Sequence, residues 1–89
     1  MSTFTAEVRV MLKPSVNDPQ GLSIRSALHT LGFDAVSDVR AGKLIALTLD
    51  AADEAAAMEA VRQMADKLLA NPVIETFEVR LLEAAAPAT

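Results

Sequence analysis

The sequence predicts an α+β fold of the ferredoxin-like kind, a β-α-β-β-α-β two-layer sandwich in which two helices cover one face of a four-stranded antiparallel sheet. Near-strict alternation of apolar and other side chains over residues 4–13 and 73–82 indicates half-buried strands at the two ends of the chain. Two β-rich runs, 36–40 and 44–49, flank Gly42 and indicate a central hairpin. A helical spacing of apolar residues lies on each side of that hairpin.

The first strand and the first helix are defined by their pattern and their end residues. The apolar face of the strand comprises Phe4, Ala6, Val8, Val10 and Leu12. Pro14 ends the strand because proline cannot donate to the sheet, and Asp18 and Pro19 suit the N-cap and first position of a helix. The expected core-facing stripe of that helix comprises Ile24, Ala27, Leu28 and Leu31. Gly32 suits the left-handed position after the helix, and Phe33 would then contact Leu28.

The hairpin turn is expected at residues 41–43, where Gly42 can reach positive φ without strain. Asp50 or Asp53 is expected to cap a second helix that ends at Asn71 and Pro72. The expected buried face of this helix comprises Ala57, Met58, Val61, Met64, Ala65, Leu68 and Leu69. In the last strand the residues expected to face inward are Val73, Phe77, Val79 and Leu81.

Length and composition limit the classes of function. The 89 residues predict one domain over residues 1–83, followed by a patternless tail at 84–89 that we expect to be disordered. A net charge of −4 with dispersed basic residues disfavours nucleic acid, and the lack of cysteine excludes disulfides and cysteine-ligated zinc. No signal-peptide pattern or membrane-length apolar run is present, so we expect a soluble cytoplasmic protein.

Two helices can cover only one face of the expected sheet. The other face would display five apolar residues among charged ones, namely Met11, Leu44, Ala46, Ile74 and Leu82. Exposed apolar area of this kind indicates contact with another protein surface. We therefore expect self-association through the uncovered sheet face or a strand edge.

The sequence offers little for catalysis. His29, the only histidine, follows Arg25 by four residues and has no nucleophile at a known motif spacing. The carboxylates at 34, 38, 50, 53 and 54 are better explained as caps and turns than as a metal site. No phosphate-binding loop is present, so we expect no catalytic, metal or cofactor residues. Arg40 and Lys43 beside Gly42 would form a charged hairpin tip suited to an acidic partner.

Four blocks of sequence resemble the PurS family of small subunits of phosphoribosylformylglycinamidine synthase. They are NDPQG at 17–21, ALHTLGFDAVSDVRAGK at 27–43, LTLD at 47–50 and KLLANPVIETFEV at 67–79. The resemblance implies a non-catalytic adaptor in de novo purine biosynthesis, which bridges a glutaminase, PurQ, and a synthetase, PurL, and assists ammonia transfer between them. It implies an ATP-dependent carbon–nitrogen ligase as the whole complex, with ATP and magnesium used by the synthetase, and a homodimer or dimer of dimers for this chain.

Within that resemblance, a partner interface is expected at four residues that have no structural explanation, Arg25, His29, Arg40 and Lys43, together with the turn residue Gly42 between the two cations. An alternative is a regulatory module of the ACT type, which shares the fold and would bind a small effector near residues 16–21. An acylphosphatase-like enzyme is disfavoured, because the arginine and glycine loop expected after the first strand is missing.

Overall fold

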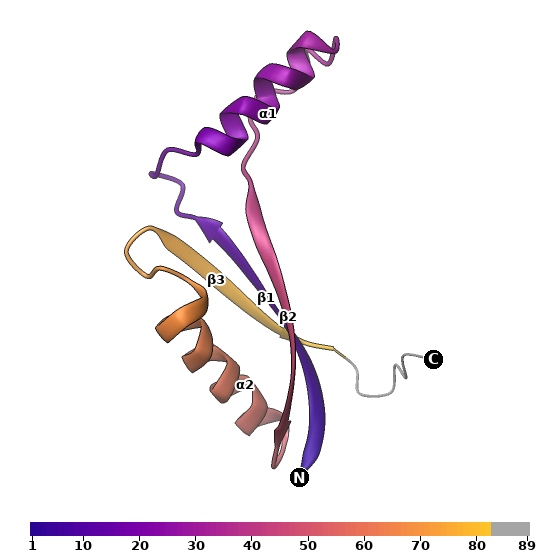
Figure 1. The fold of residues 1–89 in the computed structure, drawn as a ribbon, viewed down its shortest axis with the longest axis vertical. Helices are drawn as coiled ribbons and strands as arrows, with labels where there is room; N and C mark the ends of the chain where they lie inside the picture. Colours follow the sequence, from indigo (N-terminus) through magenta and orange to yellow (C-terminus); the bar gives the residue numbers. More distant parts are fainter. Residues whose placement is uncertain (83–89) are drawn as a thin grey trace.

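The computed structural model describes residues 1–82, so the expected tail at 84–89 lies outside the described residues. Along the chain the elements are β1 (Ser2–Leu12), α1 (Pro19–Thr30), β2 (Gly42–Ala51), α2 (Glu54–Met64), the π-helical turn η1 (Ala65–Leu69) and β3 (Glu75–Leu81). Figure 1 shows a body made of the strands and α2, from which α1 projects at one end. We call residues 14–41, which contain α1, the arm.

The sheet has three antiparallel strands in the order β2-β1-β3. In the centre Val8 lies opposite Ile45 on one side and Val79 on the other. Solved relatives described below support the α+β class, but the expected fourth strand is wrong for this chain. Residues 36–40 form no strand, and β2 and β3 are both edge strands.

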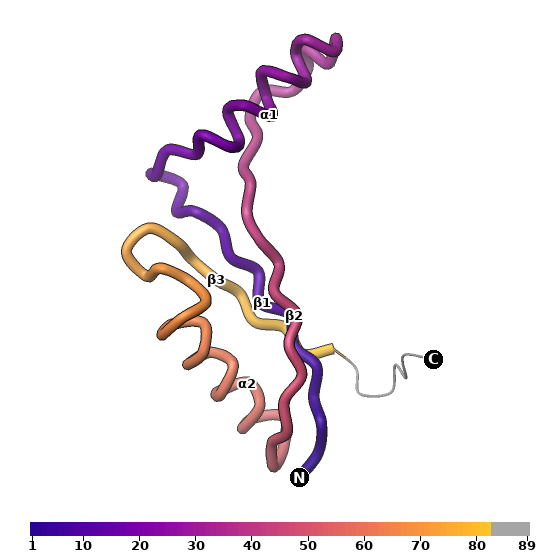
Figure 2. The backbone as a smooth tube through the Cα atoms, viewed as in Figure 1, coloured from indigo at the N-terminus to yellow at the C-terminus, as the bar shows by residue number. Residues whose placement is uncertain are grey.

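The predicted hairpin is absent because the chain does not reverse at residues 41–43. Among the described residues the one glycine with positive φ is Gly32, whereas Gly42 is simply the first residue of β2. Figure 2 shows the segment before β2 running on beyond the sheet in nearly the same direction as the strand. Contacts from the loop between β1 and α1 hold Arg40 and Ala41 in this path, and those contacts join residues more than 20 positions apart.

The core lies between the sheet and α2. Three residues of β1 are fully buried there, Ala6, Val8 and Val10, together with Ala57, Val61 and Ala65 from the helical side. Small side chains on the helix allow it to approach the sheet closely. One helix does not cover the whole face, so the residues around the core are only partly buried, namely Ile45, Leu47, Leu49, Phe77, Val79 and Leu81.

The ends of α1 are formed as predicted. The Asp18 side chain accepts a hydrogen bond from the Gly21 N–H, and Pro19 occupies the first turn. At the other end the Phe33 N–H donates to the Leu28 carbonyl and the Gly32 N–H to the His29 carbonyl, which is the Schellman arrangement. Both ends depend on residues within five positions of each other, which explains why the sequence predicts them.

The predicted burial of α1 is wrong. Of its expected stripe Leu31 is 72% exposed and Ile24 is 39% exposed, and the following Phe33 is 57% exposed. The helix projects away from the sheet (Figure 1) and contacts the chain mainly through residues of the arm itself. Helical spacing predicts which residues share a face, but it does not specify the surface on which that face packs.

The second helix ends differently from the prediction, although Asp53 caps it as expected through the Ala56 N–H. In η1 the Ala70 N–H donates to the Ala65 carbonyl, five residues earlier, so the last turn is wider than an α-helical turn. The wider turn rotates the side chains that follow it, so that Leu69 packs at the core and Leu68 is 82% exposed. The predicted burial of Leu68 and Met64 is therefore wrong, as is that of Val73, which precedes β3 and is 76% exposed.

Candidate protein-interaction site

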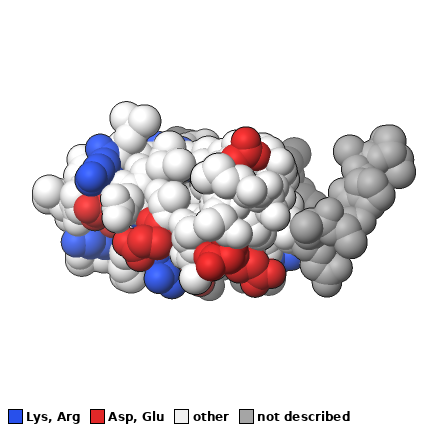
Figure 3. Space-filling view, turned by 90° about the horizontal axis from the view of Figure 1, so that it is seen from below, with Lys and Arg blue, Asp and Glu red and all other residues white. Residues whose placement is uncertain are grey.

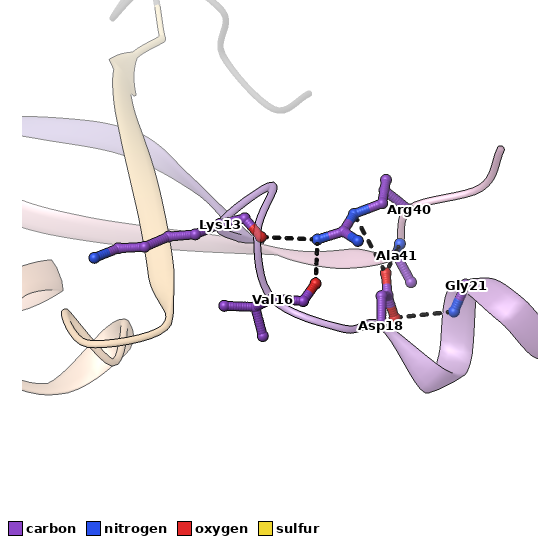
Figure 4. A network of polar contacts seen from close by, with 6 residues as sticks. All are labelled: Lys13, Val16, Asp18, Gly21, Arg40 and Ala41. Carbon is purple, nitrogen blue, oxygen red and sulfur yellow. Dashed lines mark hydrogen bonds and ion pairs between the residues drawn. The ribbon is translucent and has the colours of Figure 1, made fainter.

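A cluster of polar contacts joins the arm to the body of the molecule (Figure 4). We call it the joint, and its residues are Lys13, Val16, Asp18, Gly21, Arg40 and Ala41. The Asp18 carboxylate accepts from the Gly21 N–H at 2.9 Å through Oδ1 and from the Ala41 N–H at 2.7 Å through Oδ2. It is the one buried charged side chain among residues 1–82. One carboxylate therefore caps α1 and also fixes the segment that leads into β2.

Arg40 completes the joint from the other side. Its Nη2 donates to the carbonyl oxygens of Lys13 at 2.9 Å and Val16 at 3.0 Å, and its Nε lies 4.0 Å from Asp18 Oδ2. The two carbonyls belong to the turn that follows β1, in which the Lys13 carbonyl also accepts from the Val16 N–H at 2.9 Å. The guanidinium thus ties both ends of the arm together, and its side chain is only 28% exposed.

The joint also determines the charge state of Asp18. The hydrogen bond from the Ala41 N–H lowers the pKa of this carboxyl below its ordinary value, and the Gly21 N–H and the Arg40 charge act in the same direction. Burial opposes them but does not outweigh them. The carboxylate is therefore the form that the folded arm prefers.

Acid should loosen the joint. Because the pKa of Asp18 is lower in the folded chain than the unfolded value of 3.8, its stabilising contribution is complete above that value and is lost as the pH falls through the folded pKa. Thermal unfolding followed by circular dichroism from about pH 7 to about pH 2 should show a steep fall below about pH 4 in the wild type. In Asp18→Asn the fall should be shallower, and the stability at neutral pH lower. Parallel curves for the two proteins would contradict this role of Asp18.

The residues predicted at a partner interface do not share a hairpin tip, since the tip does not exist. Arg40 is part of the joint, Gly42 begins β2 and Lys43 is exposed beside it. The His29 Nε2 lies 2.7 Å from the Val36 carbonyl oxygen, so this histidine fastens α1 to the segment that follows it. Arg25 is half-buried and its Nε has no hydrogen-bond partner.

The expected self-association face is only partly assembled. Met11, Leu44 and Ala46 lie on the sheet face opposite α2, where Leu44 is 60% exposed. Ile74 lies in the turn before β3 and Leu82 directly after that strand. Charged residues occupy the middle of the face in register pairs, with Arg9 Nη1 at 3.7 Å from Glu78 Oε1 and both side chains mostly exposed.

A shallow hollow on this open sheet face is lined by Glu7, Arg9, Leu44, Glu78, Val79 and Arg80. The acidic and basic residues of the hollow balance one another, which suits a partner surface of mixed charge. The whole chain likewise has a net charge of only −4. Figure 3 views the end of the molecule near the N-terminus, where both acidic and basic side chains lie among largely uncharged surface. Over residues 1–82, no group of three or more His, Asp or Glu side chains is arranged to hold a metal ion.

A comparison with protein families decides the relationship. Residues 5–83 match the family model described as PurS, phosphoribosylformylglycinamidine (FGAM) synthase. The chain belongs to the PurS family. A PurS subunit from Synechocystis is 49% identical over 85 residues, covering 93% of this chain and 85% of the relative, and one from Bacillus subtilis is 41% identical, covering 93% and 98%. Members of the family are subunits of an enzyme of purine biosynthesis.

Solved PurS structures share the fold. The PurS structure from Bacillus subtilis has a TM-score of 0.80 at 41% identity and covers 90% of this chain and 99% of its own. A chain in the PurLQS structure from Thermotoga maritima has a TM-score of 0.85 at 35% identity and covers 92% of this chain and 100% of its own. These scores support the elongated arrangement with the arm extended. None of the helices in residues 1–82 is long and apolar enough to cross a membrane.

The joint is the feature that sequence reasoning missed. Asp18 is recognisable as a helix cap from its neighbours, but its second contact, to Ala41, is 23 residues away. Arg40 is recognisable only as a cation beside a glycine. A buried carboxylate opposite an arginine across an intervening helix has no local sequence signal.

Proposed function

We propose that this chain is a non-catalytic adaptor in the FGAM synthase complex, where it bridges a PurQ-type glutaminase and a PurL-type synthetase. The observation that supports it most directly is the near full-length match to PurS subunits, one of which occurs in the PurLQS structure. The complex converts formylglycinamide ribonucleotide, glutamine and ATP to formylglycinamidine ribonucleotide, glutamate, ADP and phosphate. In this proposal ATP and magnesium bind to the synthetase, and the complex works in the cytoplasm.

An adaptor of this kind acts by holding its two partner enzymes in a fixed arrangement. Ammonia released by a glutaminase is lost to solvent unless the synthetase site lies close by, so a third chain that fixes the two enzymes relative to each other raises the share that is used. The molecule offers extended surface for this role, since its longest dimension is 51 Å and its shortest 15 Å. The arm and the open sheet face are the two surfaces that could be held by different neighbours.

We also propose that the working form is a homodimer or a dimer of dimers. The exposed apolar residues of α1 and the half-covered sheet support it, because a chain of this size gains much of its stability from further burial. Light scattering at micromolar concentration should give at least twice the mass of one chain. A clean monomer would contradict this part of the proposal without touching the family assignment.

Reconstitution of the complex tests the adaptor role. With the glutaminase and synthetase from the same organism, omission of this chain should reduce glutamine-dependent formation of the amidine by at least about tenfold, which corresponds to about 1.4 kcal/mol in transition-state terms. The control is the same mixture supplied with ammonium salt in place of glutamine, in which the rate should change little. Full glutamine-dependent activity without this chain would overturn the proposal.

The ACT-type alternative has no observation in its favour. The loop at residues 16–21, where an effector would bind, already uses its polar groups in the joint: the Val16 carbonyl accepts from Arg40, and the Asp18 carboxylate accepts from Gly21 and Ala41. Calorimetric titration with amino acids and nucleotides should therefore give no heat of binding to the isolated chain.

A further inference from the structure

The hydrogen-bonding pattern of β3 shows which of its backbone groups are used. β3 pairs in unbroken register with β1 and, in the part of the chain that the structure describes, with no other strand. Just beyond the two ends of this ladder, the Lys13 N–H donates to the Ile74 carbonyl and the Leu82 N–H donates to the Thr5 carbonyl. Because hydrogen-bonded and non-hydrogen-bonded pairs alternate along an antiparallel ladder, the even-numbered residues of β3 are those that bond to β1.

The odd-numbered residues of β3 consequently direct their backbone groups to the outer edge of the sheet. Within residues 1–82, Phe77, Val79 and Leu81 have no hydrogen-bond partner on that side. Their side chains lie at the margin of the core, on the face that carries α2, and are only half-buried. The strand contains no proline and pairs without a bulge, so it lacks two of the usual features that prevent an edge strand from pairing. This edge can therefore accept another strand.

The open face of the same edge has a charge pattern that is complementary to itself. Glu78 and Arg80 are exposed there, on either side of Val79. If two such edges pair antiparallel about a two-fold axis at Val79, Glu78 of each copy lies directly opposite Arg80 of the partner subunit. Repulsion between like charges often protects an edge strand from its own copy, and in this register β3 has attraction in its place.

We propose that two copies of this chain pair through the outer edges of β3, antiparallel and about a two-fold axis at Val79. The contact is one part of the self-association proposed above, and it specifies the strand edge and the register. A second copy is indicated as the occupant because one chain supplies both members of each charge pair. The sheet then continues from one subunit into the other, with α2 of both copies on the same face.

The neighbouring registers do not satisfy the same conditions. An axis at Glu78 or at Arg80 would place that charge opposite its own copy, which is destabilising. An axis midway between two residues would place an outward-directed backbone group opposite one that already bonds to β1. An axis at Val79 pairs unlike charges and brings the free groups of Phe77, Val79 and Leu81 into hydrogen-bonding positions.

The pairing also covers apolar surface. On the face that carries α2, the half-buried Phe77 lies opposite Leu81 of the partner subunit, and Val79 lies opposite its own copy. Directly opposed apolar side chains contact one another in an antiparallel pair. The margin of the core that α2 leaves partly uncovered is thereby extended into the second subunit.

Disulfide formation between two single variants tests the register, and the absence of cysteine from the chain leaves no competing thiol. Position 78 of one copy and position 80 of the other form a non-hydrogen-bonded pair, at a Cα separation of about 4.5 Å that a disulfide spans. An equimolar mixture of Glu78→Cys and Arg80→Cys is treated with oxidised glutathione, which takes up the two electrons and two protons released by each new bond. A non-reducing gel and the intact mass should show a covalent dimer with one copy of each variant. The remaining Arg80 and Glu78 still pair in that dimer.

Each variant oxidised alone is the matched control. The two copies of position 78 are offset by two residues across the pair, at a Cα separation of about 8 Å that exceeds the reach of a disulfide, and the same holds for position 80. A mixture of Glu7→Cys and Arg9→Cys is the second control. These positions have the same spacing on the same face, but they belong to the central strand β1 and should stay unlinked.

Cross-linking of the mixture, and of neither single variant alone, supports the pairing. Free thiols in the mixture, or equal cross-linking of each variant alone, would overturn it. A covalent dimer from the β1 mixture would show that the copies meet through their open sheet faces, which also overturns it. If the thiol of Glu78→Cys reacts with a maleimide in the isolated chain and is protected only when the synthetase is added, that enzyme occupies the edge and the proposal is wrong. Circular dichroism should show folded variants, since both positions are exposed.

These outcomes are separable from the adaptor function. Free thiols in a mixture that still scatters light as a dimer overturn the pairing at β3 and leave the self-association and the role in the complex intact. Loss of the reconstitution effect, while the mixture forms its disulfide, would contradict the adaptor role and leave the pairing intact.

Discussion

Replacing Gly21 by alanine should destabilise this protein by about 3 kcal/mol, although alanine is the better helix former by about 1 kcal/mol. The new Cβ atom would overlap the Val39 carbonyl oxygen and lie 2.9 Å from Asp18 Oδ2, so α1 must move away from the segment that leads into β2. The obstacle is backbone and cannot rotate aside. The thermal midpoint, measured by circular dichroism at one fixed protein concentration, should fall by more than about 10 °C.

The control for this change is Ser23→Ala in the same helix. Ser23 is exposed, and the expected effect of its replacement is within about 0.5 kcal/mol of the wild type. A Gly21→Ala midpoint equal to that of Ser23→Ala would show that α1 does not pack on Val39.

Reversing the charge of Arg40 should cost about 2–3 kcal/mol and should disturb the arm before it disturbs the sheet. The wild-type guanidinium donates to the carbonyls of Lys13 and Val16. In Arg40→Glu the Val16 carbonyl loses its donor, the Lys13 carbonyl keeps only the Val16 N–H, and a carboxylate is placed beside that of Asp18. Hydrogen exchange should show faster exchange in residues 19–41, while the amides of the β1–β3 ladder keep their protection.

Lys43→Glu is the matched control, because it makes the same charge change three residues away on an exposed side chain. Its expected effect on stability is within about 0.5 kcal/mol. The two variants also separate structure from recognition: if the cationic surface itself contacts a partner, Lys43→Glu should weaken co-elution with the glutaminase and synthetase while leaving the midpoint unchanged. Equal loss of stability in both variants would contradict the joint as described.

The local features of the fold could be predicted from the sequence because their causes are local. The cap at Asp18, the left-handed Gly32 and the cap at Asp53 each involve residues within five positions of one another. The alternating pattern of β1 likewise predicts the buried Ala6 and Val8. The family assignment belongs to the same category, since it depends on the order of short blocks along the chain.

Local sequence features could not show in the same way whether the predicted hairpin forms. Its pattern fits two β-rich runs on either side of a glycine, but the pattern does not show whether the chain reverses at that glycine. The outcome depends on Asp18 and Arg40, which hold Ala41 and the loop after β1 and prevent the reversal. The π-helical turn is a similar case, because one wider turn exchanges Leu69 for Leu68 at the core.

The sequence by itself therefore determined the caps, the central buried strand, the α+β class and the family. Only the tertiary structure decided that α1 projects as an arm, that the sheet has three strands within the described chain and that Arg40 is a structural residue of the joint. The physical reason is that hydrogen bonds spanning more than 20 residues select among paths whose local conformational energies are nearly equal.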